Sequence, residues 1–325
     1  MTILSRRCLL KSTALLAAAA AGPAWAQGAY PDRPIKLLVP FPAGALTDSL
    51  GRLVAERLRP VLGQPFVVEN RPGAGTLLGA GQVAKSPPDG YQLMIATTTT
   101  LALSPAMFPS PPATAADFIG VGMIGSVTLM LVTRPDMKVR NLQELVAAMR
   151  AEPGRMNYAS PGNGTMHHVL MEMIKAQEKL SATHVPYQGS MPALGDVMTG
   201  RVDFMFLDAV AAMPQIQAAK VNVIAVAAAR RWMALPDVAT VAETYPLIDV
   251  QAWQSIAAPR ATPAAIVERL NLEWNRQLEL PEVRAQLLRM GVDAMPMSVA
   301  ALNALIARDE QRLGALVRSI GLKPS

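Results

Sequence analysis

Two stretches of this sequence carry the residue types that could bind a ligand, and both have the same design. In "VPFPAGALTD" (Val39–Asp48) and "ASPGNGTMHH" (Ala159–His168), an apolar strand pattern runs into a proline–glycine loop, and a helical pattern follows at once. The first N–H groups of a helix lack partners within the helix and the helix dipole is positive there, so such ends attract anions. Neither stretch contains Lys or Arg, so a carboxylate suits them better than a phosphate.

In the first loop, Phe41 to Asp48, the prolines stiffen the chain and Gly44 permits close approach or a positive φ. Thr47 or Asp48 can cap the helix. Asp48 would compete with an anionic ligand unless it turns inward as a cap. The alternative for the whole loop is an ordinary strand-to-helix turn.

The second loop is richer in hydrogen-bond donors. Ser160, Asn163 and Thr165 offer side-chain donors, while Gly162 and Gly164 expose main-chain N–H groups ahead of a helix. We expect Asn163 or Thr165 to cap that helix.

The histidines do not form a metal-binding pattern. His167 and His168 are adjacent on the predicted helix, so they point about 100° apart and cannot chelate one ion well. His184 is distant in sequence. We therefore expect no metal site, and we expect His168 to cap or pack rather than act as a base.

Further polar residues follow two other predicted strands. Thr97–Thr100 lie at a strand end, where open α/β folds bind ligands, and Asp208 lies just past another strand. The threonines could meet a polar ligand or form a simple turn. Asp208 could cap the next helix or accept a hydrogen bond from a ligand.

Motifs for catalysis and nucleotide binding are missing. "RPGAGT" (Arg71–Thr76) is rich in glycine but matches neither phosphate-binding motif, and the sequence has no G-x-S-x-G. Ser160, His168 and Asp208 follow the order seen in α/β hydrolases, but the first two share one loop–helix unit. The sequence therefore disfavours an enzyme.

The elements that must position these residues alternate between short apolar strands and amphipathic helices, which predicts α/β architecture with parallel sheets. Most of the strands are apolar throughout, as strands covered on both faces should be. The predicted strands are Ile35–Val39, Phe66–Glu69, Leu93–Thr97, Leu129–Thr133, Met156–Ala159, Val202–Phe206, Val221–Ala227 and Ala252–Ala257.

Helices are predicted where apolar residues recur at three- and four-residue spacing. Thr262 before Pro263 reads as an N-cap followed by proline at the first helical position. The other helix signals are Leu50–Leu58, Met166–Ile174, Ile266–Trp274, Glu282–Met290 and Ser298–Ile320.

The N-terminus has the pattern of an export signal, which we expect to be cleaved after Ala26. A basic segment "SRRCLLK" (Ser5–Lys11) precedes an Ala/Leu-rich run, and "AWA" (Ala24–Ala26) matches a small-x-small cleavage site. The paired arginines resemble a twin-arginine signal but also occur in ordinary secretory signals. Cys8 is the single cysteine, so the mature chain has no thiol chemistry.

Composition limits the function further. The chain has 325 residues, enough for two domains, and it is 51% hydrophobic. Removing three basic residues with the signal lowers the formal charge from +6 to +3, and the remaining charges are scattered. Nucleic-acid binding is therefore disfavoured. No later segment has the length and apolar character of a membrane span.

Motifs along nearly the whole mature chain resemble the Bug family, the extracytoplasmic solute-binding receptors of tripartite tricarboxylate transporters. The matching segments are "YPDRPIKLLVPFPAGALTD", "FVVENRPGAG", "VAKSPPDGYQLMIATT", "NYASPGNGTMHHV", "HVPYQGSMPALGDVMTGRVDFMF", "LPDVATVAE" and "AAPRATP". The resemblance implies a type II-like Venus-flytrap fold with crossing strands between lobes. Lobe I would be residues 27–125 plus 256–325, and lobe II residues 126–255.

The resemblance also implies ligand-binding positions in the cleft. They are Phe41, Ala43, Gly44, Ala45, Asp48, Thr97, Thr98, Ser160, Gly162, Asn163, Gly164, Thr165, His168 and Asp208. Ala45 and Thr76 stand where the family usually has glycine, and Pro161 and the His167–His168 pair are individual to this chain. If the family's second glycine supplies a positive φ, Ala45 would reshape the first loop.

The function implied is a monomeric periplasmic receptor, with no cofactor or metal, that passes a small carboxylate to the membrane subunits of a tripartite tricarboxylate transporter. An alternative is a ligand sensor acting through a sensor kinase. A periplasmic hydrolase or lyase is a further alternative, and it predicts turnover that depends on Ser160.

Overall fold

The computed structural model describes residues 30–322, except 229, 247, 249 and 250. The chain divides into two units, residues 1–32 and residues 33–325, and everything below concerns the second. The predicted export signal, residues 1–26, lies outside the described residues.

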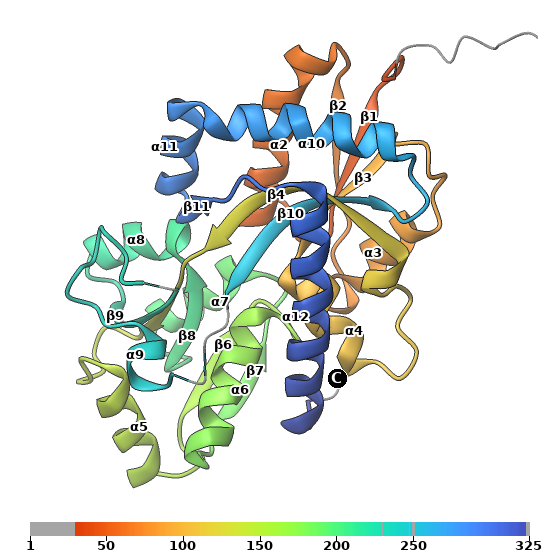
Figure 1. The fold of residues 1–325 in the computed structure, drawn as a ribbon. Helices are drawn as coiled ribbons and strands as arrows, with labels where there is room; N and C mark the ends of the chain where they lie inside the picture. The colour runs from red at the N-terminus through yellow and green to blue at the C-terminus, as the bar shows by residue number, and fades with distance from the viewer. Residues whose placement is uncertain (1–29, 229, 247, 249–250, 323–325) are drawn as a thin grey trace, which may run out of the picture. The chain divides into compact units, whose positions relative to one another are not determined.

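The first sheet has six strands in the order β11-β4-β10-β3-β1-β2 (Figure 1). β1 is parallel to β2 and β3, whereas β10 is antiparallel to β3 and β4, and β11 is antiparallel to β4. The strands are β1 Ile35–Val39, β2 Phe66–Asn70, β3 Gln92–Thr97, β4 Phe118–Val127, β10 Ala252–Pro259 and β11 Val292–Ala294.

The second sheet has five strands in the order β7-β6-β8-β5-β9. β6 is parallel to β7 and β8, and β5 is antiparallel to both of its neighbours. The strands are β5 Leu129–Thr133, β6 Asn157–Ser160, β7 Thr183–Pro186, β8 Phe204–Asp208 and β9 Asn222–Ala227.

All eight predicted strands are present, each within two residues of its predicted ends. The prediction of parallel sheets is wrong for β5 and β10, because both sheets are mixed. The strands β4, β7 and β11 were not predicted. In β4, Gly120, Gly122 and Gly125 interrupt the apolar pattern, because α12, Trp274 and β11 approach its backbone too closely for a side chain.

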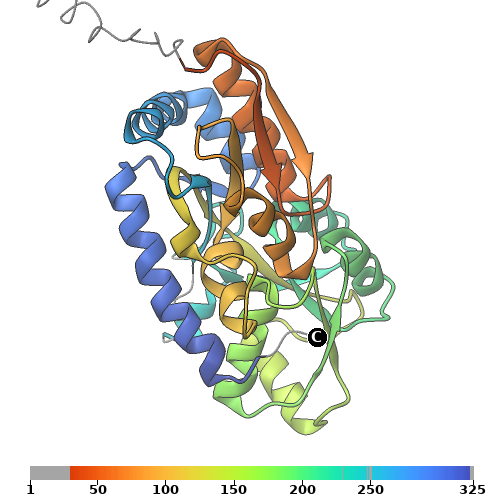
Figure 2. The same ribbon diagram turned by 90° about the vertical axis from the view of Figure 1, so that its right-hand side faces the viewer.

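The helices pack against both sheets, and α12 lies against β4 and against the η2–α4 segment (Figures 1 and 2). The helices are α2 Leu46–Leu62, η1 Ala74–Thr76, α3 Leu77–Ala84, η2 Thr99–Leu103, α4 Ser104–Met107, η3 Ala115–Asp117, α5 Leu142–Ala151, α6 Met166–Glu178, α7 Ser190–Met198, α8 Ala209–Gln217, α9 Val241–Thr244, α10 Ala264–Glu279, α11 Pro281–Arg289 and α12 Val299–Ser319.

The predicted cap of α10 is wrong. Pro263 occupies the N-cap position of α10 without a capping side chain. The Thr262 hydroxyl instead donates to the carbonyl of Pro259 at 2.8 Å, because the chain turns back there towards the end of β10.

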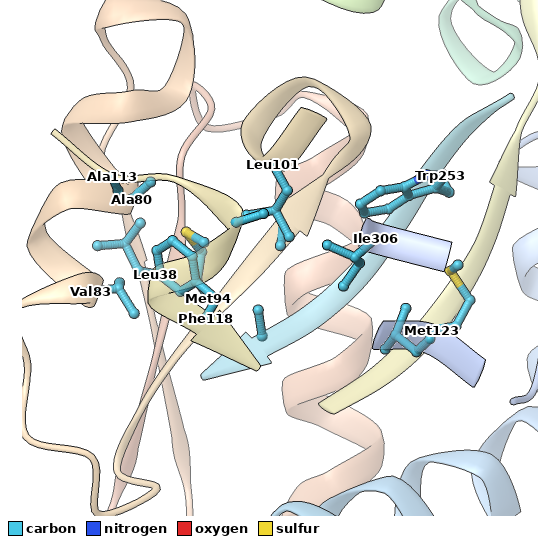
Figure 3. Close-up of a cluster of buried hydrophobic side chains, with 14 residues drawn as sticks. Leu38, Ala80, Val83, Met94, Leu101, Ala113, Phe118, Met123, Trp253 and Ile306 are labelled. Carbon is cyan, nitrogen blue, oxygen red and sulfur yellow. The ribbon is translucent and has the colours of Figure 1, made fainter. Parts of the chain in front are cut away.

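One hydrophobic core lies between α12 and the first sheet, where Leu38, Met94, Phe118 and Ile306 gather (Figure 3). Burying each such side chain contributes about 1.5–3 kcal/mol. Trp253 joins this core and donates its indole N–H to Asp309 Oδ2 on α12 at 2.9 Å. The core therefore fixes β10, which begins at the site described below.

The chain changes sheets between adjacent strands. β4 ends at Val127 in the first sheet and β5 begins at Leu129 in the second, while the returning β10 pairs Ala252 with Val127. The polar loops therefore meet where the two sheets adjoin. The predicted lobe boundaries, 125/126 and 255/256, fall within β4 and β10, and they stay a prediction.

Candidate functional site

A small cavity lies between the two sheets, with about 40 Å³ open to the centres of water-sized molecules. Of the residues of the described chain that line it, none is Lys or Arg, and Asp208 carries a carboxylate. The lining residues are Phe41, Pro42, Ala45, Leu46, Thr47, Thr97, Thr98, Thr99, Val127, Leu129, Pro161, Met166, His167, Gly189, Ser190, Asp208, Ala252, Trp253 and Gln254.

Four α-helices begin at the wall of this cavity. Leu46 and Met166 are the first residues of α2 and α6, Ser190 is the first residue of α7, and Asp208 is the N-cap of α8. None of the four N-caps forms a side-chain capping hydrogen bond. Several partly positive helix ends therefore lie around one small space. The first N–H of α6, on Met166, already donates to Thr99 Oγ1, and the first N–H of α8, on Ala209, donates to the carbonyl of Thr128. The starts of α2 and α7 therefore carry most of the case for an anion site.

The first loop is held together by Asp48, which is 3% exposed and does not line this cavity. Its carboxylate accepts hydrogen bonds from the main-chain N–H of Gly44 at 2.9 Å, from Arg52 Nε at 3.1 Å and from Asn70 Nδ2 at 3.0 Å. Burial works against ionisation, but these bonds together lower the pKa of Asp48. Asp48 therefore turns inward and shapes the loop, which removes its competition with an anionic ligand.

Ala45 is the N-cap of α2, with φ −73° and ψ 164°. This is ordinary extended backbone, and the positive φ of the loop, +80°, belongs to Gly44. Ala45 therefore needs no positive φ in this chain. The N-cap position belongs to Ala45, so the prediction that Thr47 or Asp48 caps the helix is wrong.

The threonines after β3 form the wall mainly through hydrogen bonds within the protein. Thr97 Oγ1 lies 3.1 Å from Thr100 Oγ1, and Thr98 Oγ1 accepts from the N–H of Trp253 at 2.8 Å. Thr99 Oγ1 accepts from the N–H of Met166 at 3.2 Å, and this bond joins η2 to the start of α6. These hydroxyl groups therefore shape the wall of the cavity more than they offer hydrogen bonds to a ligand.

The second loop is folded around Ser160, which is fully buried. Ser160 Oγ lies 2.7 Å from His184 Nε2 and accepts from the N–H of Gly162 at 3.2 Å. Thr165 is the N-cap of α6, as predicted, but its hydroxyl donates to the carbonyl of Gly162 at 2.8 Å and caps nothing. The N–H of Gly162 is therefore already engaged within the loop.

His168 is a packing residue of this loop. Its ring stacks on His184 at 3.8 Å, and its Nδ1 accepts from the N–H of Gly164 at 3.1 Å. Burial, with Lys175 nearby, lowers the pKa of His168 to about 4. Burial, with His168 and Lys175, lowers the pKa of His184 to about 3 against the opposing effect of Glu172. Both rings are therefore neutral at physiological pH, and their lowered pKa values make them weak bases.

His167, rather than the predicted His168, lines the cavity. Both of its ring nitrogens are buried and have no hydrogen-bond partner among the described residues. Its Nε2 lies 3.5 Å from Asp208 Oδ1, longer than a normal hydrogen bond. The His167–His168 pair in the sequence pointed to this position, but the sequence could not show which of the two histidines lines the cavity.

Gln254 is a second cavity residue that sequence reasoning missed, because nothing distinguishes it within its strand. Its amide Nε2 donates to Thr47 Oγ1 at 3.1 Å, and its Oε1 has no partner among the described residues. The side chain is 7% exposed. Buried polar groups without partners are uncommon in proteins, so both residues are suited to a ligand or bridging water.

A second, larger cavity of about 280 Å³ adjoins the first and shares Phe41, Pro42, Pro161 and Gly189 with it. Its wall includes the turn after β2, where Ala74 and Thr76 have φ +47° and +82°. Positive φ is unusual for residues with a side chain. Residues of the second loop also line this larger cavity, so it extends the site on that side.

The predicted binding residues divide into three groups. Phe41, Ala45, Thr97, Thr98 and Asp208 line the small cavity. Gly162, Asn163 and Thr165 line the larger one, together with Phe41. Six residues line neither cavity, namely Ala43, Gly44, Asp48, Ser160, Gly164 and His168.

The described residues show neither a metal-binding cluster nor a membrane-spanning helix. Within the described ranges, His, Cys, Asp and Glu nowhere gather in a group of three or more that could hold a metal ion. In the same part of the chain, every helix is too short or too polar to cross a membrane.

Solved structures with the same fold include the periplasmic binding protein BugD, which is 29% identical over 90% of this chain and 99% of its own, with a TM-score of 0.83. R. palustris Rpa4515, solved with adipate, is 30% identical over 91% of this chain and 100% of its own, with a TM-score of 0.85. MatC from Rhodopseudomonas palustris, solved with malate, is 30% identical over 89% of this chain and 100% of its own, with a TM-score of 0.82. The predicted two-lobed binding-protein fold is thereby confirmed.

The family described as "Tripartite tricarboxylate transporter family receptor" matches residues 50–322. Protein BugT of Bordetella pertussis is 34% identical over 297 residues, which cover 90% of this chain and 91% of BugT. The chain therefore belongs to the tripartite tricarboxylate transporter receptor family, and the resemblance to the Bug proteins is confirmed. Proteins of this family are solute-binding receptors.

Proposed function

We propose that this protein binds a small carboxylate in the cavity between its two sheets and delivers it to the membrane subunits of a tripartite tricarboxylate transporter. The observation that carries the proposal is the convergence of four helix N-termini on a cavity whose described lining contains no Lys or Arg. The contact residues proposed for the small cavity are Phe41, Ala45, Thr97, Thr98 and Asp208. Those around the second loop are Gly162, Asn163 and Thr165.

Main-chain donors suit a receptor that must release its cargo. A neutral hydrogen bond contributes about 1 kcal/mol net, and one to a charged group about 1.5–3 kcal/mol. Closure of the lobes would exclude bulk water and strengthen these bonds. A buried salt bridge to arginine would be harder to break on release.

The other predicted binding positions lie mainly within the two loops. Asp48 and Gly44 hold the first loop, and Ser160, Gly164 and His168 hold the second by hydrogen bonds within the protein. Ala43 is exposed and contacts neither cavity. We propose that Gly44, Asp48, Ser160, Gly164 and His168 position the ligand-binding groups rather than contact the ligand, and that Ala43 has neither role.

The relatives solved with adipate and malate support a carboxylate ligand, because both are acids held by the same fold. The burial of Ser160 supports binding rather than hydrolysis. Ser160 and His184 form a hydrogen-bonded pair, but Ser160 is 0% exposed and lines neither cavity, which argues against contact with a substrate. The periplasm, cleavage after Ala26, a monomeric state and the predicted lobe boundaries belong to the same proposal.

The proposal is tested by titration calorimetry of the mature protein with a panel of carboxylates and an Ala45→Leu variant. Ala45 lines the cavity and its backbone accepts any side chain, so leucine would fill the space and weaken binding at least roughly tenfold. Ala43→Leu is the matched control, because Ala43 lies in the same loop but is exposed. Equal affinities in the two variants would remove this cavity from the function.

A further inference from the structure

The small cavity has two chemically different sides. The helix starts offer N–H groups, which suit a carboxylate, whereas Asp208 presents a carboxylate of its own, which repels one. The described lining holds no Lys or Arg that could offset Asp208. A ligand that satisfies both sides therefore needs an acid group and, elsewhere, a hydrogen-bond donor.

The position of His167 defines what the second side accepts. Its Nε2 faces Asp208 Oδ1 at 3.5 Å, and a carboxylate oxygen favours a proton on the nitrogen that faces it. A neutral ring with its proton on Nε2 leaves Nδ1 as an acceptor. That Nδ1 is buried and receives no hydrogen bond from the described residues.

Gln254 is a further cavity residue with a polar atom that lacks a partner. It lines the same cavity, and one end of its amide is buried without a partner among the described residues. Leaving such a group unpaired costs about 1–3 kcal/mol. The protein carries this cost at His167 and Gln254 together, in one cavity, which is the expected arrangement of a site completed by its ligand.

We propose that His167 is a specificity residue that recognises a hydrogen-bond donor on the ligand, a hydroxyl or an ammonium group. The protein would then select hydroxy or amino acids over unsubstituted acids with the same carbon skeleton. This inference rests on the proposed function, because it assumes that the acid group binds at the helix starts.

The inference is tested with two sets of acids whose members differ at a single substituent. Propionate, lactate and alanine share three carbons, and succinate, malate and aspartate share four. Calorimetry on the mature protein should show that the tightest donor-bearing acid binds at least about tenfold more tightly than its unsubstituted partner. Hydroxyl and ammonium donors are distinguished within each set.

Variants of His167 then assign the preference to this side chain. His167→Phe keeps a flat ring without nitrogens and should reduce the preference to within about twofold to threefold. His167→Gln keeps an acceptor and should retain part of the preference. Gln177→Ala is the control, because Gln177 is exposed near the other end of α6 and should leave the preference unchanged.

The outcomes separate this inference from the proposed function. Equal binding within each set, or a preference unchanged in His167→Phe, would overturn the role of His167 and leave carboxylate binding intact. Succinate binding more tightly than malate and aspartate, with loss of affinity in His167→Phe, would show a charged imidazole paired with an anion and would overturn donor recognition. No binding of any of these acids would count against both proposals.

Discussion

The residues of the first loop divide their roles in a way that their types alone do not reveal. Gly44 takes the positive φ, Ala45 begins the helix in extended backbone, and Asp48 ties the loop together from inside. The loop keeps its N–H groups near the cavity because a buried carboxylate fixes its other side. Asp48, in the first turn of α2, thus supports the proposed anion site because its carboxylate points away from the cavity.

Asp48→Asn should lower the free energy of unfolding by about 2 kcal/mol at pH 7, because an amide cannot accept from all three of its donors. The pKa of Asp48 is lowered in the folded protein, so its stabilising effect is complete above the pKa of the unfolded chain, about 4. That effect is lost as the pH falls below this value. Urea unfolding across pH 3–7 should therefore show a smaller acid loss in the variant.

Asp136→Asn is the control for this change, because the Asp136 side chain is 69% exposed. It should alter stability by less than about 0.5 kcal/mol. An Asp48 variant as stable as this control would show that the loop does not depend on the buried carboxylate.

The two adjacent histidines differ in role, and the sequence predicted only one of the two roles. A step of one residue along α6 turns the side chain by about 100°, so one histidine faces His184 and the other faces the cavity. The packing role of His168 was predicted. The role of His167 depends on Asp208, which is 41 positions away in the sequence, and no local pattern carries that information.

At the scale of elements, β4 is tightly constrained by its neighbours, which approach its backbone at three glycines. A Cβ at Gly125 would lie 2.2 Å from the main-chain oxygen of Asp293 on β11. Backbone cannot move aside as a side chain can, so this glycine is required for β11 to pair. The same glycines make β4 hard to recognise from its sequence.

Gly125→Ala should lower the free energy of unfolding by about 1–3 kcal/mol, because the strand must shift to accept the methyl group. Gly195→Ala is the matched control, since it lies within α7 with no atom within 4 Å of the added Cβ. It should be neutral or stabilise the protein by up to about 1 kcal/mol. Thermal and urea unfolding of both variants measure the difference, and similar values would contradict the packing argument.

The elements predicted from sequence are those with strong local patterns. β1 and β5 have their predicted ends because both are apolar runs bounded by polar or turn residues. β11 has three residues, too few for a pattern, and the four residues of β7 are exposed or half-buried and do not form an apolar run. The antiparallel direction of β5 and β10 follows from the crossing between sheets, which is a property of the whole chain.

At the scale of the molecule, the two sheets bring together groups that no single segment contains. Thr99 follows β3 of the first sheet and accepts from Met166, which follows β6 of the second. The cavity is walled from both sides in this way, so a ligand there is enclosed by the junction of the sheets.

The most direct measurement is a crystal structure of the mature protein with the tightest-binding acid of the panel. The account predicts that the ligand carboxylate lies within about 3 Å of main-chain N–H groups at the starts of α2, α6 or α7, with no Lys or Arg side chain in contact. A ligand bound outside this cavity, or a carboxylate paired with arginine, would contradict it.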